Sequence, residues 1–152
     1  MGFQSPLLPL ERLRASLERL AWLRLRTIHT QIAAASTRLR NLEEEIRGIR
    51  ASTSERLREG MTSEQLALDS VAALEFERRG VWRLLEQLAV QRRTAEQDFM
   101  RCRRERQIVE NAVALERAAY EEERARKQQA AVDDSVLQRI SRERQDTAGD
   151  KG

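Results

Sequence analysis

The side chains that most often carry catalysis or bind metals are few in this sequence, and they are not grouped. His29 is the single histidine and Cys102 the single cysteine in 152 residues. Zinc sites and Ser-His-Asp or Cys-His arrangements require several such groups in one place. We therefore expect no catalytic residue, no metal site and no cofactor. His29 is expected to be a polar residue at a helix interface, and Cys102 to fill a small core position.

Glycines and carboxylates point to the same absence of a ligand site. The six glycines fall in neither a G-x-x-x-x-G-K nor a G-x-G-x-x-G motif, so we expect no nucleotide binding. Adjacent carboxylates occur at residues 43–45 and 121–123. On long helices such clusters usually face water. An enzyme is therefore the least favoured class.

The composition indicates helices instead. Charged residues make up 35% of the chain and aromatic residues 4%, a bias typical of long helices and unusual for a globular core. The two prolines are Pro6 and Pro9, so nothing after residue 9 interrupts a helix. Residues 1–9 are expected to be a lead-in segment.

Apolar residues then repeat at alternating spacings of three and four, as in coiled coils. The first predicted helix, residues 10–58, carries two stripes that differ in phase and meet through an 11-residue step. The second predicted helix, residues 63–142, keeps one heptad frame but places arginine at three core positions. The first-helix stripes are Leu10, Leu13, Leu17 and Leu20, and then Ile28, Ile32, Ala35, Leu39, Leu42, Ile46 and Ile49, joined through Leu17, Ala21, Leu25 and Ile28. The second-helix stripe is Ala67, Val71, Leu74, Arg78, Val81, Leu85, Leu88, Arg92, Ala95, Phe99, Cys102, Arg106, Val109, Val113 and Tyr120.

A turn is predicted at residues 59–62. Gly60 suits a helix C-cap, and Thr62 with Gln65 forms a capping box. Reversal here places residues whose numbers sum to about 121 opposite one another, so Arg78 is expected beside the glutamates at 43–45, and Trp22 beside Phe99. The sequence thus predicts an all-α fold, a long antiparallel two-helix coiled-coil hairpin with a projecting C-terminal helix.

The end of the second helix has no predicted partner within the hairpin. Its apolar stripe is therefore a candidate surface for another protein, formed by Val132, Val136, Leu137 and Ile140. Residues 143–152 are expected to be a disordered tail.

Charge and hydropathy restrict the partners. The net charge is +3, and arginine and glutamate are interleaved along most of the chain, which argues against nucleic-acid binding. No apolar run reaches the length of a membrane span, and the first residues do not form a secretory signal, so we expect a cytoplasmic protein without membrane insertion.

Particular stretches resemble a known family. RCRRERQIVE at residues 101–110, LER at 115–117 and YEEER at 120–124 follow an early LERLR at 10–14, with Arg19 and Ala21 after it. Together with the hairpin plan, residues 7–130 resemble the FliJ/YscO family of flagellar and virulence type III secretion stalk proteins. The resemblance implies a protein at the inner-membrane secretion apparatus that binds a hexameric export ATPase and the cytoplasmic domain of the export gate. Some members also handle secretion chaperones.

The resemblance also implies which side chains would bind these partners. Residues 7–25 and 100–125 would enter the ATPase ring, and the turn end of the hairpin would meet the gate. Candidate ATPase contacts are Arg14, Arg19, Arg103, Arg104, Arg117 and Arg124; candidate gate contacts are Arg47, Phe76, Arg79 and Trp82. The free hairpin is expected to be monomeric. The alternatives are a structural coiled-coil protein that dimerises, unrelated to secretion, and a basic nucleic-acid-associated helix protein.

Overall fold

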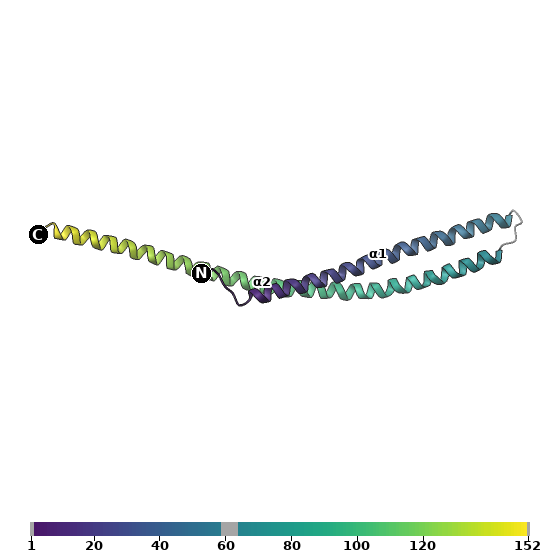
Figure 1. The fold of residues 1–152 in the computed structure, drawn as a ribbon, viewed down its shortest axis with the longest axis horizontal. Coiled ribbons are helices and arrows are strands. Elements are labelled where there is room, and N and C mark those ends of the chain that lie inside the picture. The colour runs from purple at the N-terminus through teal and green to yellow at the C-terminus, as the bar shows by residue number, and fades with distance from the viewer. Residues whose placement is uncertain (1, 59–63, 152) are drawn as a thin grey trace. The chain divides into compact units, whose positions relative to one another are not determined.

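The computed structural model describes residues 2–58 and 64–151. Within these ranges the chain forms two helices and no strand: α1, Leu8–Arg58, and α2, Glu64–Gly149. The helices pack against each other in opposite directions (Figure 1). The predicted all-α antiparallel hairpin is confirmed. The predicted turn at 59–62, with Gly60 and Thr62, lies outside the described residues.

The sequence explains where α1 begins. The Glu11 N–H donates to the Leu7 carbonyl at 2.8 Å, so Leu7 opens the helical hydrogen-bond ladder. Pro9 lies in the first turn, where its missing N–H costs nothing because the first amides of a helix have no intrahelical acceptor. Glu11 adds a negative charge near the positive end of the helix dipole. The start at Leu8 is within two residues of the predicted start at residue 10.

The chain divides into two compact units, and each helix contributes to both. Unit 1 consists of Met1–Arg14 and Glu105–Gly152, and unit 2 is Ala15–Arg104. In unit 2 the core is a line of buried side chains: Ile28, Ala35, Leu42 and Ile46 from α1, with Leu88 and Ala95 from α2. Leu42 is fully buried. Ion pairs from Arg38 to Glu77 and from Arg50 to Glu75, each 2.5 Å long, join the two helices at the edges of this core.

The heptad frame predicted for α2 is confirmed. All its positions from Ala67 to Val113, and Tyr120 after them, are buried or half-buried, including the three arginines. The pairs Arg38–Glu77 and Arg50–Glu75 bracket the predicted register, since their residue numbers sum to 115 and 125. Arg78 and Glu43 line the same small hollow at the interface, as that register requires.

The first stripe predicted on α1 is partly wrong. Leu13 is 54% exposed and Leu20 is 62% exposed, whereas Ala21 and Leu25 turn inward. The heptad frame of Ile28 therefore extends back through Leu25 and Ala21, two of the predicted joining residues, to the half-buried Glu18, Arg14 and Glu11. Leu13, Leu17 and Leu20 are exposed beside this frame, whereas Leu10 is half-buried. The inward positions at the start of α1 are polar, so the regular spacing of the leucines there predicted the wrong side of the helix for the interface.

Three further side chains test the expected interface. Trp22 is 44% exposed, and the Arg26 guanidinium lies 5.3 Å from its ring centroid. The placement of the Trp22 ring beside Phe99 stays a prediction. His29 is exposed, which contradicts its expected place at the interface. Cys102 is half-buried and free, and it lies on the interface stripe as predicted.

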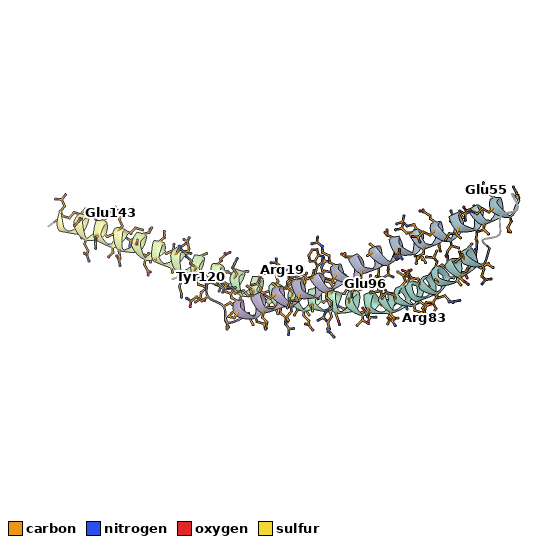
Figure 2. The ribbon with its side chains drawn as sticks, turned by 45° about the vertical axis from the view of Figure 1, so that its right-hand side comes forward. Arg19, Glu55, Arg83, Glu96, Tyr120 and Glu143 are labelled. Carbon is orange, nitrogen blue, oxygen red and sulfur yellow. The ribbon has the colours of Figure 1, made fainter. Side chains whose placement is uncertain are left out.

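Unit 1 pairs the N-terminal end of the chain with the later part of α2. Val113 is 5% exposed, and Arg14 forms an ion pair with Glu105. From residue 121 to residue 151 every side chain is exposed. Around Glu143, α2 has no other helix of unit 1 beside it (Figure 2). The described helix continues to Gly149, so the prediction of a disordered tail from residue 143 is wrong for residues 143–149, which contain helix-favouring arginine, glutamate and alanine and no proline.

Candidate protein-interaction surfaces

Of the arginines predicted to bind a partner, Arg14 is already bound within the chain. Its Nη1 donates to Glu105 Oε2 at 2.6 Å, and the two side chains are 33% and 39% exposed. The Arg14 Nε is buried without a hydrogen-bond partner. This guanidinium is directed into the interface of unit 1, so it has little capacity left for another protein.

Arg19, Arg103 and Arg104 are exposed in unit 2, near one end of its helix pair. Residues 15–26 and 92–104, which the antiparallel register places side by side, hold eight arginines and three acidic residues, a net charge of +5. Residues 27–91 hold nine arginines and ten acidic residues, a net charge of −1. The positive charge is therefore concentrated; we call residues 15–26 and 92–104 the basic zone.

Large apolar side chains are exposed within the basic zone. Leu20, Trp22 and Leu23 are 62%, 44% and 41% exposed. At about 100° per residue, Leu20 and Leu23 lie about 60° apart on one side of α1, and Trp22 lies about 100–160° away from them. Ala21 and Leu25 are apolar on the inward side. Apolar side chains therefore occur on more than one side of this part of α1, with Arg19, Arg24 and Arg26 between them.

The neighbouring part of α2 adds a hollow to the basic zone. Met100, which is 50% exposed, lies between arginines in an open hollow of about 320 Å³. Its other lining residues are Arg93, Glu96, Gln97 and Arg104. The combination of a flexible apolar side chain and flanking guanidinium groups suits an apolar residue with carboxylates beside it.

The remaining two arginines lie in unit 1. The Arg117 guanidinium lies 5.2 Å from the centroid of the Phe3 ring. Arg124 is exposed two turns further along α2. These two residues are separated from Arg103 and Arg104 by the division between the units, so the six predicted arginines do not form a single described cluster.

The residues predicted to meet the gate are all exposed. Phe76 is 69% exposed and Trp82 is 50% exposed, while Arg79 follows Phe76 by one helical turn. Phe76 and Arg79 share one side of α2, and Trp82 lies about 120° around the helix from Phe76. Arg47, on α1, lines an interface hollow with Glu43 and other residues. Phe76 and Arg79 therefore form one exposed face with an aromatic ring and a positive charge, and Trp82 and Arg47 lie outside that face.

The C-terminal stripe is exposed as expected. The exposed fractions are 55% for Val132, 46% for Val136, 64% for Leu137 and 41% for Ile140. Val132, Val136 and Ile140 follow one another at spacings of four, which keeps them within a narrow arc of α2. This arc has no covering element in unit 1.

Two features were missed by the sequence analysis. The first is an apolar groove of about 580 Å³ in unit 2, lined by Gln31, Ala34, Ala35, Arg38, Val81, Leu84, Leu88 and Gln91. The run of alanines at 33–35 was its signal, because small side chains leave a hollow beside larger ones. The second is the docking of residues 2–7 on α2 through Phe3 and Ser5. Its residues follow no helical period, so the sequence contained no comparable signal.

The charged side chains along unit 2 include surface ion pairs, of which Arg38 with Glu77 is one. The hydrogen bond from Arg38 to the Glu77 carboxylate raises the pKa of the Arg38 guanidinium above its ordinary value. A raised pKa on a group that is already cationic contributes stability that disappears only at strongly alkaline pH, so this pair adds no pH dependence near neutrality from the arginine.

The described residues offer neither a metal-binding cluster nor a membrane-spanning helix. Among them, no three His, Cys, Asp or Glu side chains are placed so that they would hold a metal ion. None of the described helices has an apolar stretch of the length that a bilayer crossing requires. Compared with protein-family models, with curated proteins and with solved structures, the chain matches none of them.

Proposed function

We propose that this chain is a non-enzymatic stalk protein of a type III secretion export apparatus, flagellar or virulence-associated. In this proposal it binds a hexameric export ATPase and the cytoplasmic domain of the export gate, with secretion chaperones as further partners. It would be located in the cytoplasm, at the inner-membrane apparatus. The resemblance of residues 7–130 to the FliJ/YscO family is one support, and the antiparallel hairpin with its longer second helix is another.

The basic zone is the observation that carries the proposal. A helix with exposed apolar side chains on more than one side, and with arginines between them, fits a partner that contacts it from several sides. A ring of subunits around the helix pair is such a partner. Because Arg19, Arg103 and Arg104 are exposed, they remain available for carboxylates on the surrounding subunits.

The balance of contacts suits a part that must move or exchange. Ion pairs between exposed groups are individually weak and are screened by salt. A partner bound through such pairs can therefore dissociate or change its position readily. The exposed Phe76 and Arg79 then provide a separate contact near the other end of unit 2, which we assign to the gate.

The test is stimulation of the export ATPase from the same cell by the purified chain. We expect the triple reversal Arg19→Glu, Arg103→Glu and Arg104→Glu to reduce stimulation at least tenfold, because each opposed charge pair contributes on the order of 1 kcal/mol or more when partly desolvated. Helicity should be unchanged. The matched control reverses three exposed arginines outside the zone, Arg40, Arg83 and Arg144. Equal loss in both triple variants, or no stimulation by the unaltered chain, would refute the proposal.

A second candidate is a structural coiled-coil protein that self-associates. The exposed stripe of Val132, Val136, Leu137 and Ile140 favours it, because such stripes often pair with another helix. Light scattering separates the two candidates: the stalk proposal predicts a monomer at micromolar concentration, and the structural candidate predicts a dimer that Val136→Asp dissociates.

A further inference from the structure

The N-terminal segment of the chain is attached to α2 by its side chains. Residues 2–7, which we call the strap, precede α1 and lie in unit 1. The Phe3 ring packs against the Tyr120 ring with centroids 5.5 Å apart and an interplanar angle of 56°. The Arg117 guanidinium lies 5.2 Å from the same Phe3 ring. Phe3 is thus held between an aromatic ring and a cation from one turn of α2.

Ser5 is the second attachment point. Its hydroxyl donates to the Glu116 carboxylate and also accepts the Leu7 N–H at 3.1 Å. Ser5 is 8% exposed, and it is the one polar residue that is buried among those the structure describes. The Leu8 N–H donates to the Ser5 carbonyl at 3.3 Å. The strap therefore connects the start of α1 to the turn of α2 that contains Glu116, Arg117 and Tyr120.

The strap covers a face of α2 that another helix would fit. Val109, Val113 and Tyr120 continue the heptad frame along which α1 packs elsewhere, and they remain buried or half-buried. The helical part of α1 begins only at Leu8, so the non-helical strap covers the last of these positions, Tyr120 (Figure 2). After Tyr120 no side chain up to residue 151 is covered.

The contacts that hold the strap are of a kind that opens easily. A cation beside an aromatic ring at an exposed site is weak, and a single side-chain hydrogen bond is modest. Gly2, Gln4 and Pro6 are exposed, so alternate residues of the strap contribute no burial. Segments with few buried contacts open locally without unfolding the rest of a protein.

We propose that the strap is a reversible cover of a helix-docking face on α2, formed by Glu116, Arg117 and Tyr120. The occupant of the uncovered face is an amphipathic helix of a partner protein, with an aromatic anchor for Tyr120 and Arg117 and a hydrogen-bond donor for Glu116, because these are the groups that the strap supplies. The strap and the partner helix compete, so the strap sets how much of the chain is ready to bind. That the partner belongs to the export apparatus rests on the proposed function.

The opening is measurable on the full chain alone, because Tyr120 is its single tyrosine. We expect Phe3→Ala to increase the rate of Tyr120 acetylation by N-acetylimidazole roughly two- to fivefold, the factor that corresponds to losing a cation–ring contact at an exposed site. Ser5→Ala should act in the same direction. The matched control is Gln4→Ala, which removes an exposed side chain from the same segment and should leave the rate unchanged.

Hydrogen exchange distinguishes a reversible cover from a fixed part of the fold. The Leu7 and Leu8 amides, which donate to Ser5, should exchange through an opening with almost no urea dependence, whereas the amides of unit 2 near Leu42 should exchange only on global unfolding. The inference is overturned if the strap amides exchange only with global unfolding, or if Phe3→Ala leaves Tyr120 acetylation unchanged.

The competitive role has its own readout, with the export ATPase as the probe. Phe3→Ala should bind the ATPase more tightly than the unaltered chain by the factor found for Tyr120 acetylation. Equal or weaker binding of Phe3→Ala overturns the competition. If neither protein binds the ATPase, the proposed function fails, and the cover itself is still decided by acetylation and exchange.

Discussion

Arg14 Nη1 lies 2.6 Å from Glu105 Oε2, and this contact joins the first turns of α1 to α2 in unit 1. Both side chains are about one-third exposed, and the Arg14 Nε is buried without an acceptor. Arg14 was expected to bind a partner through its positive charge. Its geometry indicates instead that it sets the pairing of the helices, because its charge is already matched within the chain.

A double-mutant cycle tests this role of Arg14. We expect Arg14→Met and Glu105→Gln each to lower the free energy of unfolding by about 0.5–1.5 kcal/mol, since each leaves a partly buried polar group without its partner. The double variant should be less destabilised than the sum of the two, by about 0.5 kcal/mol or more. Urea unfolding followed by circular dichroism provides the values. Strict additivity would show that the two side chains do not interact.

Leu42 and Leu20 give a second prediction, because both are leucines on α1 and only one is covered. Leu42 is fully buried and Leu20 is 62% exposed. Leu42→Ala should destabilise the chain by about 2–4 kcal/mol through the lost burial and the resulting cavity, and Leu20→Ala by no more than about 0.5 kcal/mol. Thermal unfolding measures both.

The same pair of variants bears on the proposed function. Leu20→Ala leaves the fold intact but removes an exposed apolar side chain from the basic zone, so we expect it to weaken stimulation of the export ATPase. A chain with Leu20→Ala that is stable and fully stimulating would remove the apolar part of the argument for that zone.

The interface positions of α2 were predictable from the sequence, because its apolar residues follow one frame over many heptads. A frame repeated that often leaves one choice for the packed side of the helix, and even Arg78 and Arg92 are half-buried there. The beginning of α1 differs, since two stripes compete there. Leu13 and Leu20 formed the more regular pattern but are exposed, whereas Ala21 and Leu25, predicted to join the two stripes, are half-buried. Periodicity alone does not decide between two apolar stripes on one helix.

The candidate surfaces were less predictable than the fold. The exposure of Phe76 followed from its position outside the heptad frame, and that of the C-terminal stripe from its place beyond the end of the predicted helix pairing. The strap did not, because the contact of Phe3 with Tyr120 joins residues of no common period across more than a hundred positions. The ion pair of Arg14 with Glu105 was also not predictable, because it joins residues that are far apart in the sequence.

Arg92 provides a third prediction, as a charged residue at a core position. Its Nε is buried without a hydrogen-bond partner, and its nearest carboxylate, Glu96 Oε1, is 3.7 Å away, too far for a hydrogen bond. We expect Arg92→Leu to raise the free energy of unfolding by about 0.5–2 kcal/mol, because an apolar side chain fits the heptad position without that cost. Urea unfolding measures the change.

Arg106 is the matched control, since it lies in the same frame but donates to Glu110 at 2.9 Å. Arg106→Leu should raise the free energy of unfolding by less than Arg92→Leu does, because it also removes this hydrogen bond. Equal gains would mean that hydrogen bonding at the core arginines is irrelevant to stability, and a loss for Arg92→Leu would mean that its guanidinium is satisfied by groups other than Glu96.

The final prediction concerns the part of α2 beyond Tyr120. From residue 121 to residue 151 no side chain is buried, and the ion pairs there, such as Arg126–Glu122, lie within the helix itself. A helix of this kind is supported by its own hydrogen bonds and by weak pairs along its surface. A chain that ends at Glu123 should therefore lose helical ellipticity in proportion to the residues removed, while its free energy of unfolding in urea changes by no more than about 0.5 kcal/mol. A markedly lower midpoint would show that Val132, Val136 or Ile140 packs on the remainder of the chain in solution, and these residues would then belong to the protein's own core and not to a surface for a partner.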